Sequence, residues 1–491
     1  MTTSDVGLQP RSLKVVGIQN YGPSGTMLLH SLLDGHPQVL SLPGLYPIGI
    51  YSGWRTFVDG LSRRMKLDDV LAFLLNWARP LYDEQHLELA WGLGELGEHR
   101  DANCCVSLED FRCHLAAALH GMGLDEILAA PAEPSATARQ ARKIALLAVY
   151  IAYARCLGLA IEEKDTVVYP VHSSEIQDLR DLLEDFPELF VIHMIRDPVD
   201  GLFSTVNHNR MWLDRFLSTS LVDPFLAAIV QMTTDRTPLV PRLEPFHSMT
   251  PFAPAVASRC RAIRLEDLHQ APERTMTAIA DWVGLTWNDA LLQSTFAGKK
   301  WWNRPGLRRV SGFRTGMSRS EDVTRWDRRR IAAITSPVRR KVRYDTTVRH
   351  GHVRRALALA GLMAPFAVER TTSNLLRHYA LFVTRGPLRT FPRFCRRRES
   401  LLSALFEART TMLARPDPDT QAATETSLDW VREVVAGLRN VGGSHTCPGR
   451  IEWWCAVLYG RTYTYWANRH ALLNGWLALR RRSDWVEALM S

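Results

Sequence analysis

The chain has 491 residues and a formal net charge of +9, so it is long enough to bury a sizeable core and to form more than one domain. Its eight cysteines form no CxxC pair and no histidine spacing suited to zinc, which argues against a disulfide scaffold or a zinc module. The N-terminus lacks a basic segment followed by an apolar core, and the longest apolar runs, residues 144–154 and 356–368, fall short of the roughly 20 residues that span a bilayer. We therefore expect a cytoplasmic protein, soluble or peripherally attached to the inner membrane face.

A glycine-rich turn follows the first predicted strand. Residues 14–19 (KVVGIQ) read as a buried strand, residues 20–26 (NYGPSGT) as a turn, and the apolar segment after them as a helix. Successive backbone N–H groups at Ser24, Gly25 and Thr26 would point at an anion over the positive end of the helix dipole. The turn lacks the Gly-Lys-Ser/Thr ending of a Walker A loop. The pattern predicts a phosphate-binding turn of another kind.

This turn resembles the 5′-phosphosulfate loop of the sulfotransferases that use 3′-phosphoadenosine 5′-phosphosulfate (PAPS). The family loop usually reads Pro, a basic residue, Ser, Gly, Thr and then Thr or Ser, and Ser24, Gly25 and Thr26 match it. The continuation HSLLDGHPQVLSLPG resembles bacterial members. The basic position falls on Pro23, however, and the position after the threonine is Met27. Because the basic side chain normally neutralises the phosphosulfate, the departure implies a substitute cation or impaired catalysis.

Transfer of a sulfuryl group to an alcohol requires a general base within hydrogen-bond reach of the attacking hydroxyl. The predicted strand at residues 166–169 leads into His172, where family members commonly carry a Lys-Thr-Pro or Lys-Thr-His segment. The resemblance therefore implies His172 as the base, although the lysine of that segment is absent. Glu175, His30 and His36 are the alternatives.

Residues 191–204 (VIHMIRDPVDGLFS) end a predicted strand on Arg196 and place Ser204 eight positions further on, in the helix that follows. Asp197 is a natural helix N-cap, and Pro198 suits the first helical position. Open α/β sheets bind ligands at the carboxyl ends of their strands. In the PAPS-dependent sulfotransferases an arginine and a serine at this spacing grip the 3′-phosphate of the cofactor. The resemblance assigns that role to Arg196 and Ser204.

A third segment resembles the part of the family that folds over the nucleotide. Residues 262–284 read as a strand, an acidic turn and an amphipathic helix ending in glycine, and a basic loop follows at residues 298–313. Trp301 or Trp302 is a candidate stacking face for the adenine. The resemblance implies these basic residues as cofactor contacts: Lys299, Lys300, Arg308 and Arg309.

Basic residues gather in one part of the chain. Residues 299–398 hold 26 Lys or Arg and 5 Asp or Glu, a net charge of +21, which leaves −12 for the rest. The first part of this tract would attract an anionic cofactor. In the later part arginines alternate with apolar residues, which suits an anionic membrane surface or an ordinary solvated face. No nucleic-acid partner is expected, because no nucleic-acid-binding module accompanies the tract.

These segments together predict an α/β fold with a P-loop-like parallel sheet flanked by helices. The sulfotransferase-like domain would cover residues 10–345, with helical insertions at residues 52–155 that shape the acceptor pocket. Residues 346–491 would form a helical C-terminal extension.

The resemblance implies a PAPS-dependent sulfotransferase (EC 2.8.2 type) that moves a sulfuryl group to a hydroxyl on a carbohydrate, lipid or small metabolite. No metal is expected, because the phosphosulfate is already activated. One alternative is a catalytically impaired relative that binds the nucleotide and acts as an interaction protein, as the proline at position 23 suggests. Another is a kinase-like enzyme, which the missing Walker lysine opposes.

Overall fold

The computed structural model describes residues 13–19, 24–46, 49–61, 64–87, 92–130, 134–171, 176–197, 200–201, 258–303, 311–314, 324–334 and 343–344. The chain divides into two compact units. Unit 1 comprises residues 1–20, 24–195 and 246–317, and unit 2 comprises residues 21–23, 196–245 and 318–491. Nearly all described elements belong to unit 1.

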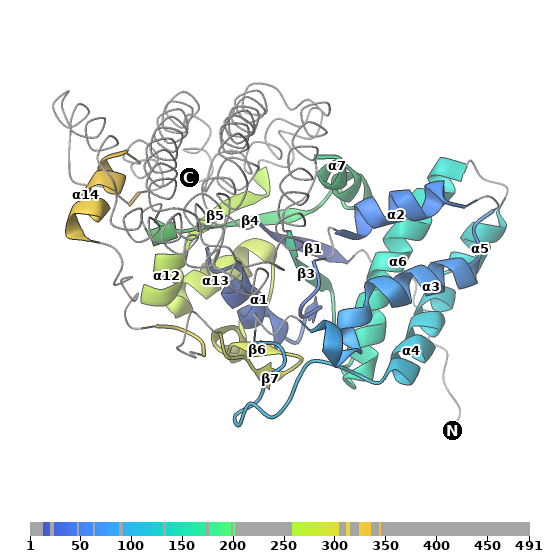
Figure 1. Cartoon of the computed structure of the whole chain (residues 1–491), viewed down its shortest axis with the longest axis horizontal. Helices are drawn as coiled ribbons and strands as arrows, with labels where there is room; N and C mark the ends of the chain where they lie inside the picture. The colour runs from blue at the N-terminus through green and yellow to red at the C-terminus, as the bar shows by residue number, and fades with distance from the viewer. Residues whose placement is uncertain are drawn as a thin grey trace, which may run out of the picture. The chain divides into compact units, whose positions relative to one another are not determined.

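A five-stranded sheet in the order β2-β3-β1-β4-β5 forms the centre of unit 1 (Figure 1). All of its strand pairs are parallel. Three of its strands are buried at nearly every position, as expected for a parallel sheet covered on both faces. This confirms the predicted α/β fold with a parallel sheet flanked by helices. The strand bounds are β1 Lys14–Gln19, β2 Val39–Ser41, β3 Thr166–Val171, β4 Phe190–Ile195 and β5 Cys260–Arg264.

Three helices pack against one face of this sheet: α1 (Thr26–Asp34), α12 (Leu265–Gln270) and α13 (Pro272–Val283). Leucines of α1 meet Ile18 of β1 and Ile192 of β4 in a single hydrophobic core. The apolar residues of α1 fall on adjacent turns, so burying them against the strands is the main source of stability for this short helix. The α13 helix ends at Gly284, whose φ of 80° closes the helix in the left-handed conformation.

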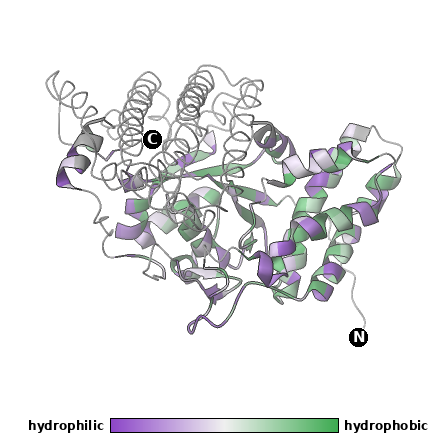
Figure 2. Ribbon diagram, viewed as in Figure 1, coloured by the Kyte–Doolittle hydropathy of each residue, from purple (hydrophilic) through white to green (hydrophobic). Residues whose placement is uncertain are grey.

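The segment between β2 and β3 forms a group of helices beside the sheet (Figure 1). They are α2 (Gly49–Asp59), α3 (Leu67–Trp77), α4 (Leu108–Gly121), α5 (Leu124–Ala129) and α6 (Pro134–Cys156). Ser107 caps α4 by accepting a hydrogen bond from the backbone N–H of Asp110 at 3.3 Å. Hydrophobic and hydrophilic residues are mixed along these helices (Figure 2), and the buried residues of α4 are all apolar, among them Phe111 and Leu115.

The α7 helix (Ile176–Asp185) connects β3 to β4. The remaining described elements are short: the 3-10 turns η1 (Arg79–Leu81), η2 (Glu84–His86) and η4 (Asp289–Leu292), the hairpin β6 (Thr295–Phe296) and β7 (Lys299–Lys300), and α14 (Arg325–Ile334). The predicted C-terminal extension at residues 346–491 lies outside the described residues. The predicted domain boundary near residue 345 therefore stays a prediction.

Candidate active site

The glycine turn begins where the central strand ends. The β1 strand finishes at Gln19 and α1 starts at Thr26. Gly25 has a φ of 91°, and a Cβ added there would lie 2.3 Å from Cδ1 of Leu265, the first residue of α12. The left-handed conformation and the close packing both require glycine at this position. The described residues thus place a left-handed glycine between β1 and α1, and the phosphate contact of the turn stays a prediction.

The N-terminus of α1 is equipped to receive an anion. Among the described residues no side chain caps this helix, and its first turn contains no acidic residue. Its first backbone N–H groups carry the positive end of the helix dipole. Ser24 and Thr26 are buried, and the Thr26 hydroxyl has no hydrogen-bond partner among the described residues. A buried hydroxyl without a partner is costly, so a ligand atom at this position would stabilise it.

The predicted 3′-phosphate element belongs to unit 2. Arg196 directly follows β4 in the chain and is half-buried. The Asp197 carbonyl accepts a hydrogen bond from the Gly201 N–H at 2.7 Å, the bond expected where a helix begins after Asp197. Ser204 lies outside the described residues. The strand therefore ends where the sequence predicts it, and the helix after it and the phosphate contact stay predictions.

Both predicted general bases fall outside the described residues. His172 comes next in the chain after Val171, the last residue of β3, and Glu175 precedes α7. Val171 is paired in register with Gln19. The chain therefore leaves β3 for this segment beside the strand that leads into the glycine turn.

The two alternative histidines are engaged elsewhere. His30 is completely buried in α1, where Nε2 lies 2.8 Å from the Ser41 hydroxyl, and burial lowers its pKa to about 3. His36 is also buried, and its Nε2 lies 2.8 Å from the Thr286 carbonyl. Desolvation lowers the pKa of His36 as well. His36 precedes β2, so it lies at the amino edge of the parallel sheet, opposite the edge where β1 meets the glycine turn. Neither imidazole is placed to act at the turn.

The two described lysines that the sequence predicts as cofactor contacts, Lys299 and Lys300, lie far from the glycine turn. The Lys299 ammonium donates to the Asn103 carbonyl at 2.8 Å, and the Lys300 ammonium donates to the Glu98 carboxylate at 2.7 Å. Their hairpin contacts the C-terminal end of α1, where the Gly298 N–H donates to Asp34 at 3.3 Å. That end is about 13 Å from the glycine turn, since a helix rises 1.5 Å per residue. The role of both lysines in cofactor binding stays a prediction, and Arg308 and Arg309 lie outside the described residues.

The two tryptophans of this loop also have partners in the protein. Trp301 is 1% exposed and packs edge-on against Phe296 in the core, with 5.4 Å between the ring centroids. The Trp302 indole donates to the Gly97 carbonyl at 2.7 Å, and the Lys300 ammonium lies 4.6 Å from the centroid of its ring. Trp301 therefore serves as a core residue, which removes it as an adenine stacking face.

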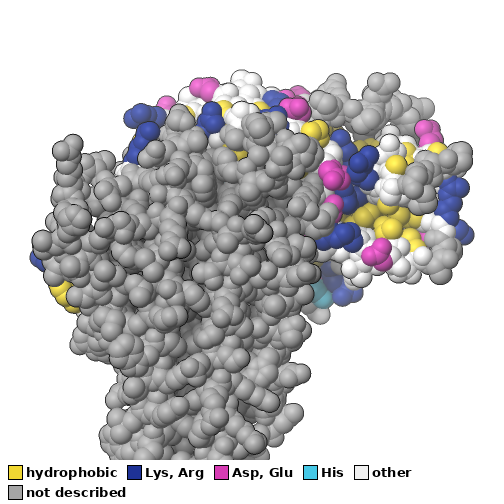
Figure 3. All heavy atoms as spheres, turned by 90° about the horizontal axis from the view of Figure 1, so that it is seen from above, with side chains coloured by type: hydrophobic (Ala, Val, Ile, Leu, Met, Phe, Trp, Pro, Cys, Tyr) yellow, Lys and Arg dark blue, Asp and Glu magenta, His cyan; other side chains and the backbone are white. Residues whose placement is uncertain are grey.

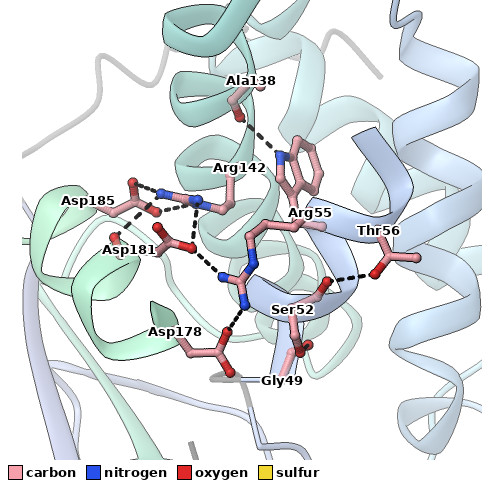
Figure 4. Close-up of polar contacts among 10 residues, drawn as sticks. Gly49, Ser52, Arg55, Thr56, Ala138, Arg142, Asp178, Asp181 and Asp185 are labelled. Carbon is pink, nitrogen blue, oxygen red and sulfur yellow. Dashed lines mark hydrogen bonds and ion pairs between the residues drawn. The ribbon is translucent and has the colours of Figure 1, made fainter. Parts of the chain in front are cut away.

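A charged network that the sequence did not reveal holds α7 against the helical insertion (Figure 4). Arg142 of α6 forms a bidentate pair with Asp185, at 2.9 and 2.8 Å. Arg55 of α2 bonds to Asp178 at 2.6 Å and also to Asp181. Burial raises the pKa of Asp185, and the Arg142 guanidinium opposes that shift. The three aspartates are three and four residues apart and share one face of α7, yet nothing in their spacing identifies arginines 123 or 43 positions away.

Neither a metal site nor a membrane span is seen in the part of the chain that the structure describes. No group of three or more His, Cys, Asp or Glu side chains in it is arranged to hold a metal ion. None of the described helices is long and apolar enough to cross a bilayer.

Comparison with solved structures finds bacterial sulfotransferases. The sulfotransferase domain of the Synechococcus PCC 7002 olefin synthase is 18% identical, with a TM-score of 0.31, and the match covers 59% of this chain and 80% of that one. The sulfotransferase domain of the curacin biosynthetic pathway is 15% identical, with a TM-score of 0.34 and coverage of 66% and 98%. Sulfotransferase STF9 from Mycobacterium avium is 19% identical, with a TM-score of 0.29 and coverage of 57% and 66%.

Identities and TM-scores this low carry no argument by themselves. No curated protein matches the chain. The model of the sulfotransferase family, in contrast, matches residues 22–289, which is more than half of the chain. The matched segment begins in the glycine turn and runs through the strands and helices described above. This chain belongs to the sulfotransferase family.

Proposed function

We propose that the chain transfers the sulfuryl group of PAPS to a hydroxyl on a carbohydrate, lipid or small metabolite. The observation that carries this proposal is the N-terminus of α1 after Gly25, which lies at the carboxyl end of the central strand and has no side-chain cap among the described residues. The Thr26 hydroxyl and the tight backbone at Gly25 suit an oxyanion that approaches the backbone closely. PAPS would supply the activated sulfuryl group.

Two sets of residues would bind the two phosphate groups of the nucleotide. The backbone N–H groups of Ser24, Gly25 and Thr26 would bind the 5′-phosphosulfate, and Arg196 with Ser204 would bind the 3′-phosphate. Charge-assisted bonds from a guanidinium are about twice as strong as neutral ones, so Arg196 would contribute most to affinity. Arg308 and Arg309 remain further candidates for contact with the nucleotide.

Transfer needs a proton acceptor as well as a bound donor. The acceptor oxygen would form a bond to sulfur as the bond between sulfur and the bridging phosphate oxygen breaks, and the nucleotide would leave as 3′-phosphoadenosine 5′-phosphate (PAP). His172 would take the proton of the attacking hydroxyl, with Glu175 as the alternative base. Both precede α7 in the chain, a helix that Arg55 and Arg142 bind through Asp178 and Asp185.

A second candidate function is nucleotide binding without efficient turnover, in a protein that acts by interaction. Pro23 favours it, because this position carries the charge that stabilises the leaving phosphate in relatives. Lys299 and Lys300 could replace that charge by family analogy, but both are bonded at the far end of α1. Binding of PAP without transfer by the wild-type protein would identify this function.

The basic tract at residues 299–398 raises the question of a membrane partner. Most of the tract lies outside the described residues. On the face shown in Figure 3, the described Lys and Arg side chains are interspersed with Asp and Glu. We propose attachment to an anionic membrane surface for the part of the tract beyond residue 344, because arginines alternate with apolar residues there. Its test is salt-sensitive sedimentation with anionic liposomes of the full chain but not of a chain ending near residue 345.

The function itself is tested with radiolabelled PAPS and a panel of hydroxyl acceptors. We expect transfer of label to at least one sugar, lipid or phenol, and loss of transfer in His172→Ala with PAP affinity unchanged. Wild-type transfer in His172→Ala would move the base assignment to Glu175. A wild-type protein that does not bind PAP would contradict both candidate functions.

A further inference from the structure

The strand order of the sheet marks where a ligand should bind. From β1 the chain continues to β2 and β3 on one side of the sheet, and from β4 it continues to β5 on the other. In open α/β sheets, ligands bind outside the carboxyl ends of the two strands where the order reverses in this way. Here those strands are β1 and β4. The side chains at their ends are therefore the first to examine for a ligand contact.

Gln19 is the last residue of β1, at this reversal. It is paired in register with His193 of β4 and with Val171 of β3. Paired residues of parallel strands project from the same face of a sheet. That face is opposite the one covered by α1, because Ile18 packs with the α1 leucines and side chains alternate along a strand. Gln19, at the end of β1, and His193, two residues before the end of β4, thus lie on the same face of neighbouring strands.

The Gln19 amide oxygen is buried and lacks a hydrogen-bond donor among the described residues. The side chain is 2% exposed, and its Oε1 has no hydrogen-bond partner among the described residues. Strand interiors normally carry apolar side chains, and a buried amide oxygen without a donor is destabilising. The Thr26 hydroxyl, on the other side of the glycine turn, is also buried and has no hydrogen-bond partner among the described residues. Two polar atoms without a hydrogen-bond partner in the described part of the chain therefore lie on either side of the turn that the proposed function uses.

We propose that Gln19 is a specificity-determining residue, whose amide oxygen accepts a hydrogen bond from a hydroxyl of the acceptor substrate. An amide oxygen is an acceptor only, so it selects a ligand that brings a donor. It is also too weak a base to remove a proton, so its role is recognition, and the general base stays a separate group. The inference rests on the proposed function, because it places the acceptor beside the turn that holds the phosphosulfate.

Sites built to hydrogen-bond a hydroxyl discriminate strongly against ligands that lack one, because the buried protein group is then left without a partner. The neutral amide also distinguishes this contact from the charged groups proposed to bind the nucleotide. A substitution at Gln19 should therefore raise the KM for the acceptor without changing the affinity for the nucleotide. This separation makes the proposal testable apart from PAP affinity.

The test replaces the amide with a side chain of similar length. Gln19→Met should raise the KM for the acceptor about tenfold, since losing one hydrogen bond to a buried partner corresponds to about 1.4 kcal/mol. PAP affinity by calorimetry should stay within twofold of the wild type. Gln19→Asn, which keeps an amide, should show a smaller rise in KM. The hydroxyl probes are methyl β-D-glucopyranoside, 1-octanol and 4-nitrophenol, and each variant is assayed with those that the wild type sulfates.

Tyr169→Phe is the matched control. Tyr169 is also fully buried on this face of β3, and its hydroxyl has no hydrogen-bond partner among the described residues. It lies two residues before the end of β3, about 7 Å further from the sheet edge than Val171. Its removal should leave the acceptor KM unchanged. A similar change in KM in this control would show a general effect of altering the buried face.

Three results would overturn the proposal. An unchanged KM in a folded Gln19→Met variant would leave the amide without a role in recognition. A loss of PAP affinity in that variant would assign the amide to the nucleotide instead. A wild-type protein that binds PAP but transfers to none of the probes would contradict the proposed enzymatic function, and this inference would fail with it.

Discussion

The polar groups at the two edges of the central sheet differ in their hydrogen bonding. At the amino edge, His36 is bonded through both ring nitrogens, and the Lys164 ammonium donates to the His36 carbonyl at 3.2 Å. Asp34, at the end of α1, accepts bonds from Thr295 and from the Gly298 N–H. At the carboxyl edge, the start of α1 has no side-chain cap among the described residues.

We use this difference in hydrogen bonding to distinguish polar groups that stabilise the fold from polar groups that bind a ligand. A fold that satisfies its own buried donors and acceptors at one edge can do so at the other, unless a ligand is to take their place. Buried atoms elsewhere, such as the Tyr169 hydroxyl, also lack a hydrogen-bond partner among the described residues, so it is the position of the Gln19 and Thr26 atoms beside the glycine turn that makes them candidates for a ligand contact. The predictions below change one edge at a time.

The largest effect is expected at Gly25. Gly25→Ala combines a strained φ of 91° with a Cβ only 2.3 Å from Leu265, and each of these typically costs about 1 to 3 kcal/mol. We expect the free energy of unfolding in denaturant to fall by about 2 to 4 kcal/mol, and PAP affinity to fall by more than tenfold.

Gly121→Ala is the control for this substitution, because nothing lies within 4 Å of a Cβ added at the last residue of α4. That variant should be as stable as the wild type or more stable by up to about 1 kcal/mol. Wild-type PAP affinity in a folded Gly25→Ala variant would remove the turn from the binding site.

The next largest effect concerns the charge on the 3′-phosphate. Arg196→Ala should weaken PAP binding by more than tenfold, because a charge-assisted contact contributes roughly 1.5 to 3 kcal/mol. Lys300→Ala removes a cation at the amino edge, where its partner is Glu98, and should leave affinity within twofold. Calorimetry measures the PAP affinity of both variants and shows which edge of the sheet contacts the nucleotide. Equal losses would show that the lysine also contacts the nucleotide, as the family resemblance implies.

A gain of activity is expected from restoring the family's cation. Pro23→Lys should raise the rate of sulfuryl transfer severalfold, since Lys299 and Lys300 are bonded at the other end of α1 and a charge at the leaving oxygen favours the transition state. The rate is measured under saturating PAPS. A level or lower rate would mean that another residue already supplies this charge, and Arg308→Ala would then be the first variant to assay.

The sequence predicted the elements whose signal is local. Long apolar runs identified β1, β3 and β4, and Gly25 with the apolar helix after it identified the turn. The three-residue β2 strand carries too short a run to be distinguished from a loop. The network of Arg55 and Arg142 with α7 joins residues far apart in sequence, so no spacing rule could find it.

The site residues also divide into those with a local sequence signal and those that depend on the folded structure. Arg196 and the Ser24–Thr26 turn were predicted because a family motif surrounds them, whereas Gln19 reads as the end of an ordinary strand. The role proposed for it rests on strand order and on an amide oxygen with no hydrogen-bond partner in the described part of the chain, which are properties of the folded chain. Trp301 was misassigned as a candidate stacking face, because burial of an aromatic residue depends on the β6–β7 hairpin folding under α1.

The smallest effect is a pH dependence from the amino edge. Burial raises the pKa of Asp34 to about 6, against the hydrogen bonds from Gly298 and its neighbours. Between about pH 4 and pH 6 the folded chain holds a proton that the unfolded chain has released, so this group's stabilising contribution is lost as the pH rises through that window. Asp34→Asn should remove that dependence, a change of about 1 kcal/mol between the two ends of the window, since partial contact with water reduces the effect.

Denaturation of the wild type and Asp34→Asn at pH 4 and pH 6 checks this sign. His30 acts in the opposite sense, because its lowered pKa lets the unfolded chain bind the extra proton as the pH falls below about 6.5. Only the difference between the two proteins isolates Asp34. A difference that does not change with pH would mean that Asp34 titrates alike in both states.

The most direct test of the central claim, that the carboxyl edge of the sheet holds the nucleotide, is a crystal structure of the chain with PAP. The account predicts the 5′-phosphate on the backbone N–H groups of Ser24, Gly25 and Thr26, and the 3′-phosphate on the Arg196 guanidinium. A nucleotide bound instead beside Lys299 and Lys300, or no bound nucleotide at millimolar PAP, would contradict it.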